Sequence, residues 1–207
     1  MTARDVPGDV VVLLFDGRRL PRSLTGLTCV EVSAPDDLTV PEQVARVIVV
    51  GGHVALAATL SRLLRDDLLD VEVGFVPPWR PTRWGVAHRA RTGAAQRVPL
   101  IRDETGAVIV RSARWLPSRD AAITGEAVVD DTVLFDGQST GVEIEPLPQV
   151  PGLRARTLGT GARGWVSGRA VQIGSTGLLI ERDGVTAPRP ARRSAFYRHI
   201  QGWLRVG

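Results

Sequence analysis

The sequence predicts an α/β plus all-β fold, in which a small parallel α/β sheet domain precedes an antiparallel β-sandwich-like domain. In the first part of the chain, apolar runs typical of buried strands alternate with helical patterns, as in a parallel sheet. Beyond Arg97, helical periodicity almost disappears, and short β-branched segments are separated by turn signals such as Asp136-Gly137. The predicted limits are 1–95 for the α/β domain, 96–192 for the β domain and 193–207 for a C-terminal segment.

Four strands and two helices are expected in the α/β domain. The threonine, proline and glutamate of Thr39-Val40-Pro41-Glu42 have the spacing of a helix start and predict a short helix there. A second, amphipathic helix is predicted by leucines at positions 56, 60, 63 and 64, which fall on one helical face. The four predicted strands are Val10–Phe15, Leu27–Val32, Val47–Val50 and Val71–Val76.

In the β domain, Gly141–Glu145 alternates apolar and polar residues with period two, as a half-buried strand does. The segment from Phe196 to Val206 is rich in aromatic and large apolar residues, so we expect it to pack back onto the chain. Cys29 lies in a predicted strand and is expected to be a buried thiol. As the single cysteine, it excludes an internal disulfide framework and a cysteine-rich metal site.

The composition narrows the chemistry. All 26 basic residues are arginine, which excludes a P-loop lysine and a Schiff-base lysine, and the lack of lysine and asparagine indicates a GC-rich, actinobacterial-type composition. The net charge of +4 permits contact with phosphates or an anionic membrane surface, whereas no nucleic-acid-binding motif is present. The sequence shows no transmembrane segment or signal peptide, so we expect a cytoplasmic protein, with peripheral membrane attachment as an open alternative.

The strongest site signal is the step from the Val47–Val50 strand through Gly51 and Gly52 into a helix. A strand, a glycine turn and a helix N-terminus together form a common anion-binding arrangement, because backbone N–H groups and the helix dipole converge there. Phosphoryl transfer also needs an acid to place a metal or orient a nucleophile, and this turn offers His53 in its place. The sequence therefore indicates a ligand position and argues against the usual chemistry there.

The chain resembles the diacylglycerol kinase catalytic family, which includes bacterial lipid kinases and is distantly related to the NAD kinases. Val47–Gly52 is similar to the strand and opening of the family's Gly-Gly-Asp-Gly-Thr motif, and Gly74–Pro77 is similar to the approach to its Gly-Thr-Gly-Asn loop. Gly168–Ile173, Asp183–Val185 and Phe196–His199 are similar to the family's C-terminal β domain. The resemblance implies a diacylglycerol-kinase-like fold over most of the chain.

The departures from that family carry the functional prediction. His53-Val54-Ala55 stands where the family has Asp-Gly-Thr, and residues 78–84 put two tryptophans and two prolines where it has a glycine cradle. Asp16 or a neighbour stands at the family's asparagine. These losses imply a non-catalytic, diacylglycerol-kinase-like protein that acts as a lipid-, nucleotide- or protein-binding regulatory module. The alternatives are an active lipid kinase with an altered phosphate loop and a protein-binding scaffold.

The candidate ligand site combines three loops at the carboxyl ends of parallel strands. No catalytic residue, metal or cofactor is expected there; the ligand would be an anionic lipid headgroup or a nucleotide, and the oligomeric state stays open. The Trp79–Trp84 segment is either part of this interface or a linker whose tryptophans wedge the two halves together. The candidate residues are Asp16, Gly17, Gly51, Gly52, His53, Trp79, Arg80, Arg83 and Trp84.

Overall fold

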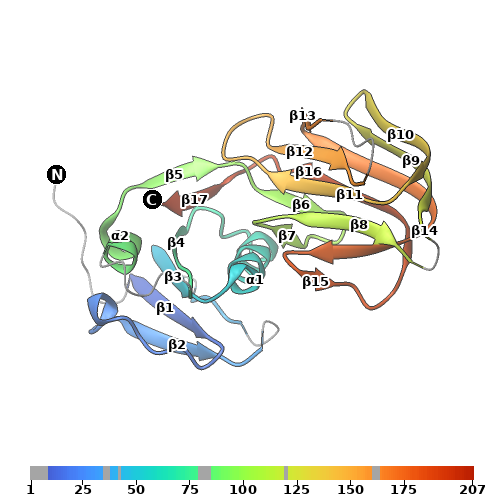
Figure 1. The fold of residues 1–207 in the computed structure, drawn as a ribbon. Coiled ribbons are helices and arrows are strands. Elements are labelled where there is room, and N and C mark those ends of the chain that lie inside the picture. The colour runs from blue at the N-terminus through green and yellow to red at the C-terminus, as the bar shows by residue number, and fades with distance from the viewer. Residues whose placement is uncertain (1–8, 35–37, 42, 79–84, 119–120, 160–163) are drawn as a thin grey trace. The chain divides into compact units, whose positions relative to one another are not determined.

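The computed structural model describes residues 9–34, 38–41, 43–78, 85–118, 121–159 and 164–207 (Figure 1). They belong to two compact units, Met1–Val98 with Gly202–Gly207, and Pro99–Gln201. Each unit is built around one sheet: six strands in the first unit and eleven in the second. This architecture confirms the predicted class, an α/β part with parallel strands followed by an antiparallel β part.

The first unit contains a largely parallel sheet with the strand order β2-β1-β3-β4-β17-β5, in which only β5 runs antiparallel to its neighbour. Its strands lie close to the predicted apolar runs, because β-branched residues suit a strand buried on both faces. The elements are β1 (Val10–Phe15), η1 (Arg22–Leu24), β2 (Thr28–Val32), β3 (Arg46–Val50), α1 (His53–Arg65), β4 (Glu72–Val76), α2 (Val86–Thr92), β5 (Ala95–Val98) and β17 (Trp203–Val206).

The two helices cover opposite faces of this sheet (Figure 1). Ala90 of α2 packs with Val12 and Ile48 in one cluster, whereas the start of α1 lies against Phe15, whose side chain points to the other face. The short helix α2 was not predicted. Only Ala90 of its seven residues is buried, so its apolar periodicity is too weak to recognise in the sequence.

Two sequence-based expectations about this unit are wrong. No helix follows Thr39: Val44 N–H donates to the Pro41 carbonyl in a turn, and the chain then joins the sheet through Asp9. The turn is enough to bury both Val40 and Val44, so burial of these side chains does not require a helix. Cys29 is exposed, because it lies on the edge strand β2, where alternate side chains point away from the core.

Arg46 ties α2 to the sheet. Its Nε donates to Glu72 Oε2 at 2.8 Å, and its Nη2 donates to the Gly93 carbonyl at 2.9 Å. Its Nη1 donates to the carbonyls of Ala90 and Arg91. A helix leaves its last carbonyls without helical partners, and a cation there also suits the helix dipole. Arg46 is therefore a structural residue.

The second unit is an antiparallel, strongly bent sheet with the order β13-β12-β11-β8-β14-β16-β6-β7, to which β9, β10 and β15 add by pairing with β14 or with each other. The 13-residue β14 pairs with β9 along its first half and with β8 along its second half. The strands are β6 (Ile101–Asp103), β7 (Val108–Ile109), β8 (Ala113–Pro117), β9 (Ile123–Val129), β10 (Thr132–Ser139), β11 (Val142–Pro146), β12 (Leu153–Thr157), β13 (Val166–Gly168), β14 (Ala170–Arg182), β15 (Val185–Thr186) and β16 (Ala191–Arg198).

The core of this unit is centred on Trp115 and Phe196, both fully buried, with ring centroids 6.0 Å apart. On the opposite face of β11, Glu143 accepts hydrogen bonds from Arg156 (Nη2, 2.7 Å) and Arg114 (Nη2, 2.9 Å). These two guanidinium groups, Arg156 above all, hold the pKa of Glu143 below its ordinary value against the opposing effect of burial. The alternation predicted for Gly141–Glu145 thus separates an apolar core from an ion-pair network.

The C-terminal segment divides between the two sheets. Phe196 of β16 is fully buried in the core of the second unit, whereas Trp203 and Val206 of β17 are buried in the first unit. Between these strands, Ile200 is fully exposed. The aromatic-rich ending is therefore a structural part of both units. None of the helices among the described residues is long and apolar enough to cross a membrane.

Candidate functional site

The candidate site lies at the edge of the first sheet where β1, β3 and β4 end. These strands run parallel in the order β1-β3-β4, so the residues that follow Phe15, Val50 and Val76 lie at the same edge. The loops there begin with Asp16–Gly17, Gly51–Gly52 and Pro77–Pro78. The structure thus brings the two predicted glycine turns to one edge, whereas Trp79, Arg80, Arg83 and Trp84 lie outside the described residues.

The two glycines of the central turn have different roles. Gly51 is buried, and a Cβ added to it would lie 2.7 Å from Ala55 Cβ and 3.1 Å from Phe15 Cβ. The close packing of α1 against the end of β1 therefore requires glycine at position 51. A Cβ on Gly52 would meet nothing within 4 Å, and its φ of −80° suits any residue. Sterics do not require glycine at position 52.

Gly52 is the N-cap of α1 and supplies no side chain to cap the helix. The first helical bond runs from Leu56 N–H to the Gly52 carbonyl at 3.2 Å, and the first turn contains no acidic residue. The first N–H groups of an α-helix have no acceptor within the helix, and the dipole makes this end positive. The N-cap residue therefore supplies no side-chain cap to the 13-residue helix α1 at the sheet edge.

His53 and Val54 flank this helix N-terminus. The imidazole of His53 lies against the ring of Phe75, with centroids 5.7 Å apart and planes tilted by 38°. The Val54 side chain is 42% exposed. The two positions after Gly52 thus carry an aromatic-packed imidazole and an exposed aliphatic group, and neither supplies a carboxylate.

The turn that follows β1 contains Asp16, the one acid among the predicted site residues. Asp16 and Gly17 both have positive φ, 57° and 61°, and Arg18 N–H closes the turn on the Phe15 carbonyl at 3.2 Å. Positive φ at two consecutive positions favours an Asp-Gly pair. The Asp16 side chain is 68% exposed, and its Oδ2 lies 3.8 Å from Arg18 Nε.

Two arginines near these strand ends were not in the predicted site. Arg18 Nε is buried and, within the described part of the chain, has no hydrogen-bond partner. Arg89 of α2 lines a small cavity of about 280 Å³ with Phe75 and Pro77 at the end of β4. In the sequence, only the arginine-rich segments around them could have indicated these two residues. Such segments more often form a solvated surface than a binding site.

The described side chains contain no group of three or more His, Cys, Asp or Glu arranged to hold a metal ion. The backbone N–H groups and arginines at this edge suit an anion, whereas Asp16 is the carboxylate there.

No family model matches the chain, and no curated protein matches its sequence. Solved structures do match. An NAD kinase from Archaeoglobus fulgidus in complex with ATP superposes with a TM-score of 0.66 at 9% identity, covering 96% of this chain and 93% of that chain. Two structures of a candidate diacylglycerol kinase from Bacillus anthracis str. Sterne superpose with TM-scores of 0.67 and 0.64 at 10% and 9% identity, each covering 96% of this chain and 97% of the other.

This chain has the fold of those kinases. The predicted diacylglycerol-kinase-like fold is thereby confirmed over nearly the whole length of the chain. At such low identity the likeness establishes the fold alone, because one fold can host unrelated functions. The function must be argued from the residues at the sheet edge.

Proposed function

We propose that this kinase-fold protein binds an anionic group at the N-terminus of α1 and does not transfer phosphate. The observation that carries the proposal is the N-terminus of α1, at which Gly52 supplies no capping side chain and no acid follows in the first turn. Backbone N–H donors there suit a phosphate or sulfate oxygen. The buried Nε of Arg18, close to the end of the adjacent strand β1, adds a second cationic group that suits an anion; among the described residues it has no hydrogen-bond partner, and it lies 3.8 Å from Asp16 Oδ2.

The proposed absence of phosphate transfer rests on the residues that occupy the turn. Phosphoryl transfer depends on positioning and on neutralising charge, usually through a metal held by acids. The family resemblance implies Asp-Gly-Thr after the glycine pair, whereas this chain has His53, packed on Phe75, and then Val54. Asp16 is mostly exposed, and its Oδ2 forms an ion pair with Arg18 Nε at 3.8 Å.

The proposed ligand class depends on the space that Val54 leaves in front of the N-terminus of α1. Val54 projects from the first turn of α1, so we infer that a compact anion fits there better than an extended triphosphate. A nucleotide is the alternative favoured by the ATP bound to the NAD kinase of the same fold. A lipid headgroup would add attachment to a membrane surface, and a regulatory protein partner would use the same exposed edge.

We expect Gly52→Asp to abolish anion binding while stabilising the free protein. The new side chain meets nothing within 4 Å, and aspartate is a good N-cap, so the free energy of unfolding should rise by about 0.5–1 kcal/mol. The same carboxylate would occupy the anion position and repel the ligand. The measurement is thermal unfolding with and without inorganic phosphate, since a ligand of the native state raises apparent stability.

Gly52→Ala is the matched control, because it adds a Cβ into the same open space without a charge or a cap. It should retain phosphate binding within about 3-fold. Phosphate binding that survives Gly52→Asp in a folded protein would place the anion elsewhere and contradict the proposed site.

We expect no transfer of phosphate from MgATP to diacylglycerol, related lipids or NAD. Without an acid after Gly52, this turn lacks a carboxylate to place a metal beside the transferred phosphate. A radiolabelled-ATP assay against a panel of these acceptors is the measurement. Turnover that disappears in His53→Ala and Gly52→Asp variants would establish the alternative, an active kinase with an altered phosphate loop. Turnover that both variants retain would indicate a contaminating kinase.

A further inference from the structure

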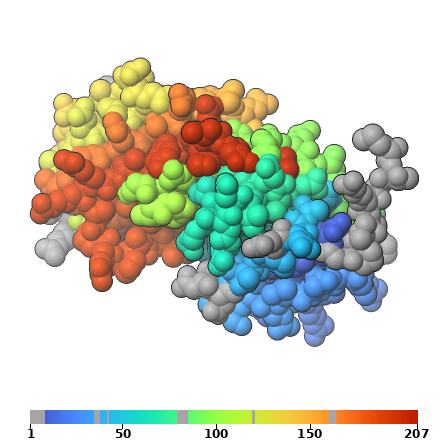
Figure 2. Space-filling model, turned by 180° about the vertical axis from the view of Figure 1, so that it is seen from behind, coloured from blue at the N-terminus to red at the C-terminus, as the bar shows by residue number. Residues whose placement is uncertain are grey.

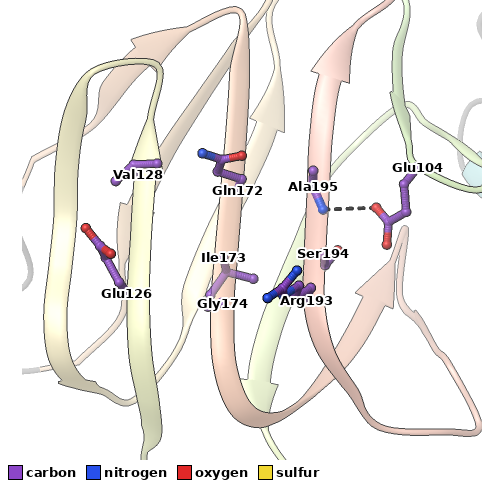
Figure 3. Close-up of a pocket in the computed structure, with 9 residues that line it drawn as sticks. All are labelled: Glu104, Glu126, Val128, Gln172, Ile173, Gly174, Arg193, Ser194 and Ala195. Atoms are coloured by element: carbon purple, nitrogen blue, oxygen red, sulfur yellow. Dashed lines mark hydrogen bonds between the residues drawn. The ribbon is translucent and has the colours of Figure 1, made fainter.

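The second unit has a surface hollow of about 630 Å³ that is separate from the α1 site. This volume falls in the range of small-molecule sites. It lies where β9, β14 and β16 run side by side (Figure 3), and in Figure 2 the yellow β9–β10 hairpin borders the orange-to-red residues of β14 and the segment after it. The lining residues are Glu104, Glu126, Val128, Gln172, Ile173, Gly174, Arg193, Ser194 and Ala195.

Strand register arranges two rows of residues across this hollow. Gln172 of β14 lies opposite Val128 on one side and Ala195 on the other. One pleat along, Gly174 lies between Glu126 and Arg193 in the same way.

The absence of a side chain at position 174 creates the hollow. A Cβ on Gly174 would meet nothing within 4 Å, so the space between Glu126 and Arg193 is open. The pairing of β14 with β16 is also interrupted between Gly174 and Leu178, which bends the strand at this point. The result is a concave surface with a charged residue of opposite sign on each side.

These two charges lie on the surface on either side of Gly174. Glu126 and Arg193 are exposed and, among the described residues, have no side-chain hydrogen bond or ion pair. Their Cα atoms lie two strand spacings apart, about 10 Å. Figure 3 shows the Arg193 side chain directed toward Gly174, whereas the Glu126 carboxylate is turned away from it. An exposed side chain changes rotamer within nanoseconds, so Glu126 can turn toward a ligand.

Two further polar groups border the hollow. Glu104 Oε2 accepts a hydrogen bond from the Ala195 N–H at 2.9 Å, which holds that carboxylate at the far end of the first row (Figure 3). The exposed Gln172 amide lies in the middle of that row and can both donate and accept. The hollow therefore presents carboxylates, one guanidinium and one amide around an uncharged floor.

We propose that this hollow binds a small zwitterion that carries an ammonium group and a phosphate or carboxylate group. The anionic group pairs with the Arg193 guanidinium, whose planar fork suits phosphate and carboxylate oxygens. The ammonium group pairs with Glu126, and the short connecting chain lies over Gly174. Neither half alone satisfies both charges, so the intact zwitterion binds more tightly than either half.

The test is chemical-shift titration of the ¹⁵N-labelled full chain with phosphoethanolamine and, separately, β-alanine. At least one zwitterion should shift the amide signals of Glu126, Gly174 and Arg193, with an affinity at least about 10-fold above those of ethanolamine and inorganic phosphate. Glu126→Gln and Arg193→Gln should each weaken that binding about 10-fold. Gly174→Leu should block it without removing a charge, because its side chain fills open space.

Arg192→Gln is the matched control, because it removes the same charge from the adjacent residue, which does not line the hollow. It should leave binding unchanged. The proposal is overturned if neither zwitterion shifts these signals, if ethanolamine or inorganic phosphate shifts the same signals with equal affinity, or if binding survives Glu126→Gln, Arg193→Gln and Gly174→Leu in folded proteins.

A co-sedimentation experiment with phosphatidylethanolamine vesicles distinguishes the sources of such a group. Co-sedimentation that is lost in Arg193→Gln and retained in Arg192→Gln supports a lipid headgroup as the ligand. Binding of the dissolved zwitterion alone supports a free metabolite. Phosphate binding at α1 is measured with Gly52 variants, so failure of either proposal leaves the other standing.

Discussion

Deleting residues 194–207 is expected to prevent stable folding of the whole chain. The deletion removes β17, which lies between β4 and β5 in the first sheet, and most of β16, which lies between β14 and β6 in the second. Phe196, Trp203 and Val206 are all buried, and burial of each large apolar side chain contributes about 1.5–3 kcal/mol. Their combined loss approaches the total stability of a typical domain, and the broken ladders add to it.

The measurements are soluble yield and thermal unfolding by circular dichroism. Trp203→Ala is a milder test of the first sheet and should cost about 3–5 kcal/mol. Ile200→Ser is the control, since Ile200 is fully exposed between the two strands, and it should change stability by less than about 0.5 kcal/mol. A truncated chain with an unchanged melting curve would show that both sheets close without these strands.

Asp103→Ala is expected to destabilise the second unit strongly, by about 3–5 kcal/mol. Asp103 is completely buried, and its Oδ1 accepts hydrogen bonds from Thr105 N (2.8 Å), Thr105 Oγ1 (2.7 Å) and Ala107 N (3.0 Å). Its Oδ2 accepts from Arg182 Nε at 2.7 Å. The substitution leaves these donors without an acceptor and Arg182 without its counter-charge.

Denaturant unfolding of three variants checks this prediction. Asp131→Ala, an exposed acid in a turn, should change the free energy of unfolding by less than about 0.5 kcal/mol. Arg182→Met introduced together with Asp103→Ala should recover part of the loss, because it removes the uncompensated charge. Equal stability of Asp103→Ala and Asp131→Ala would mean that the buried pair contributes nothing to folding.

Strands buried on both faces were the most predictable elements. The apolar runs at 10–15, 47–50 and 71–76 became β1, β3 and β4 with ends displaced by no more than one residue. A continuous β-branched run can bury itself only in a covered sheet, so its own composition suffices. The helix predicted to start at Thr39 is absent, because a threonine, a proline and a glutamate at this spacing also suit a turn. Hydrogen bonds from Ala45 and Arg46 to Asp9, directly before the neighbouring strand, favour the turn.

The place of the glycine turn at the sheet edge was predictable from the sequence, whereas the contacts of its residues were not. A strand followed by two glycines and a leucine-rich helix locates the sheet edge, since the pattern is local to about 20 residues. The sequence could not distinguish a glycine required by packing, Gly51, from the N-cap glycine of the helix, Gly52, because Phe15 contacts the turn from 36 positions earlier. The sequence likewise could not separate the structural arginine, Arg46, from Arg18 and Arg89, because only their surroundings in the fold differ.

The sequence alone determined the fold class, the parallel strands, helix α1 and the absence of an acid after Gly52, because each depends on residues that are near neighbours in the chain. Tertiary structure decided the rest. The return of β17 to the first sheet, the burial of Asp103 beside Arg182 and the opposition of Glu126 and Arg193 across Gly174 join residues 67 to 132 positions apart. Pairings at such separations depend on strand order and register, which no local pattern encodes.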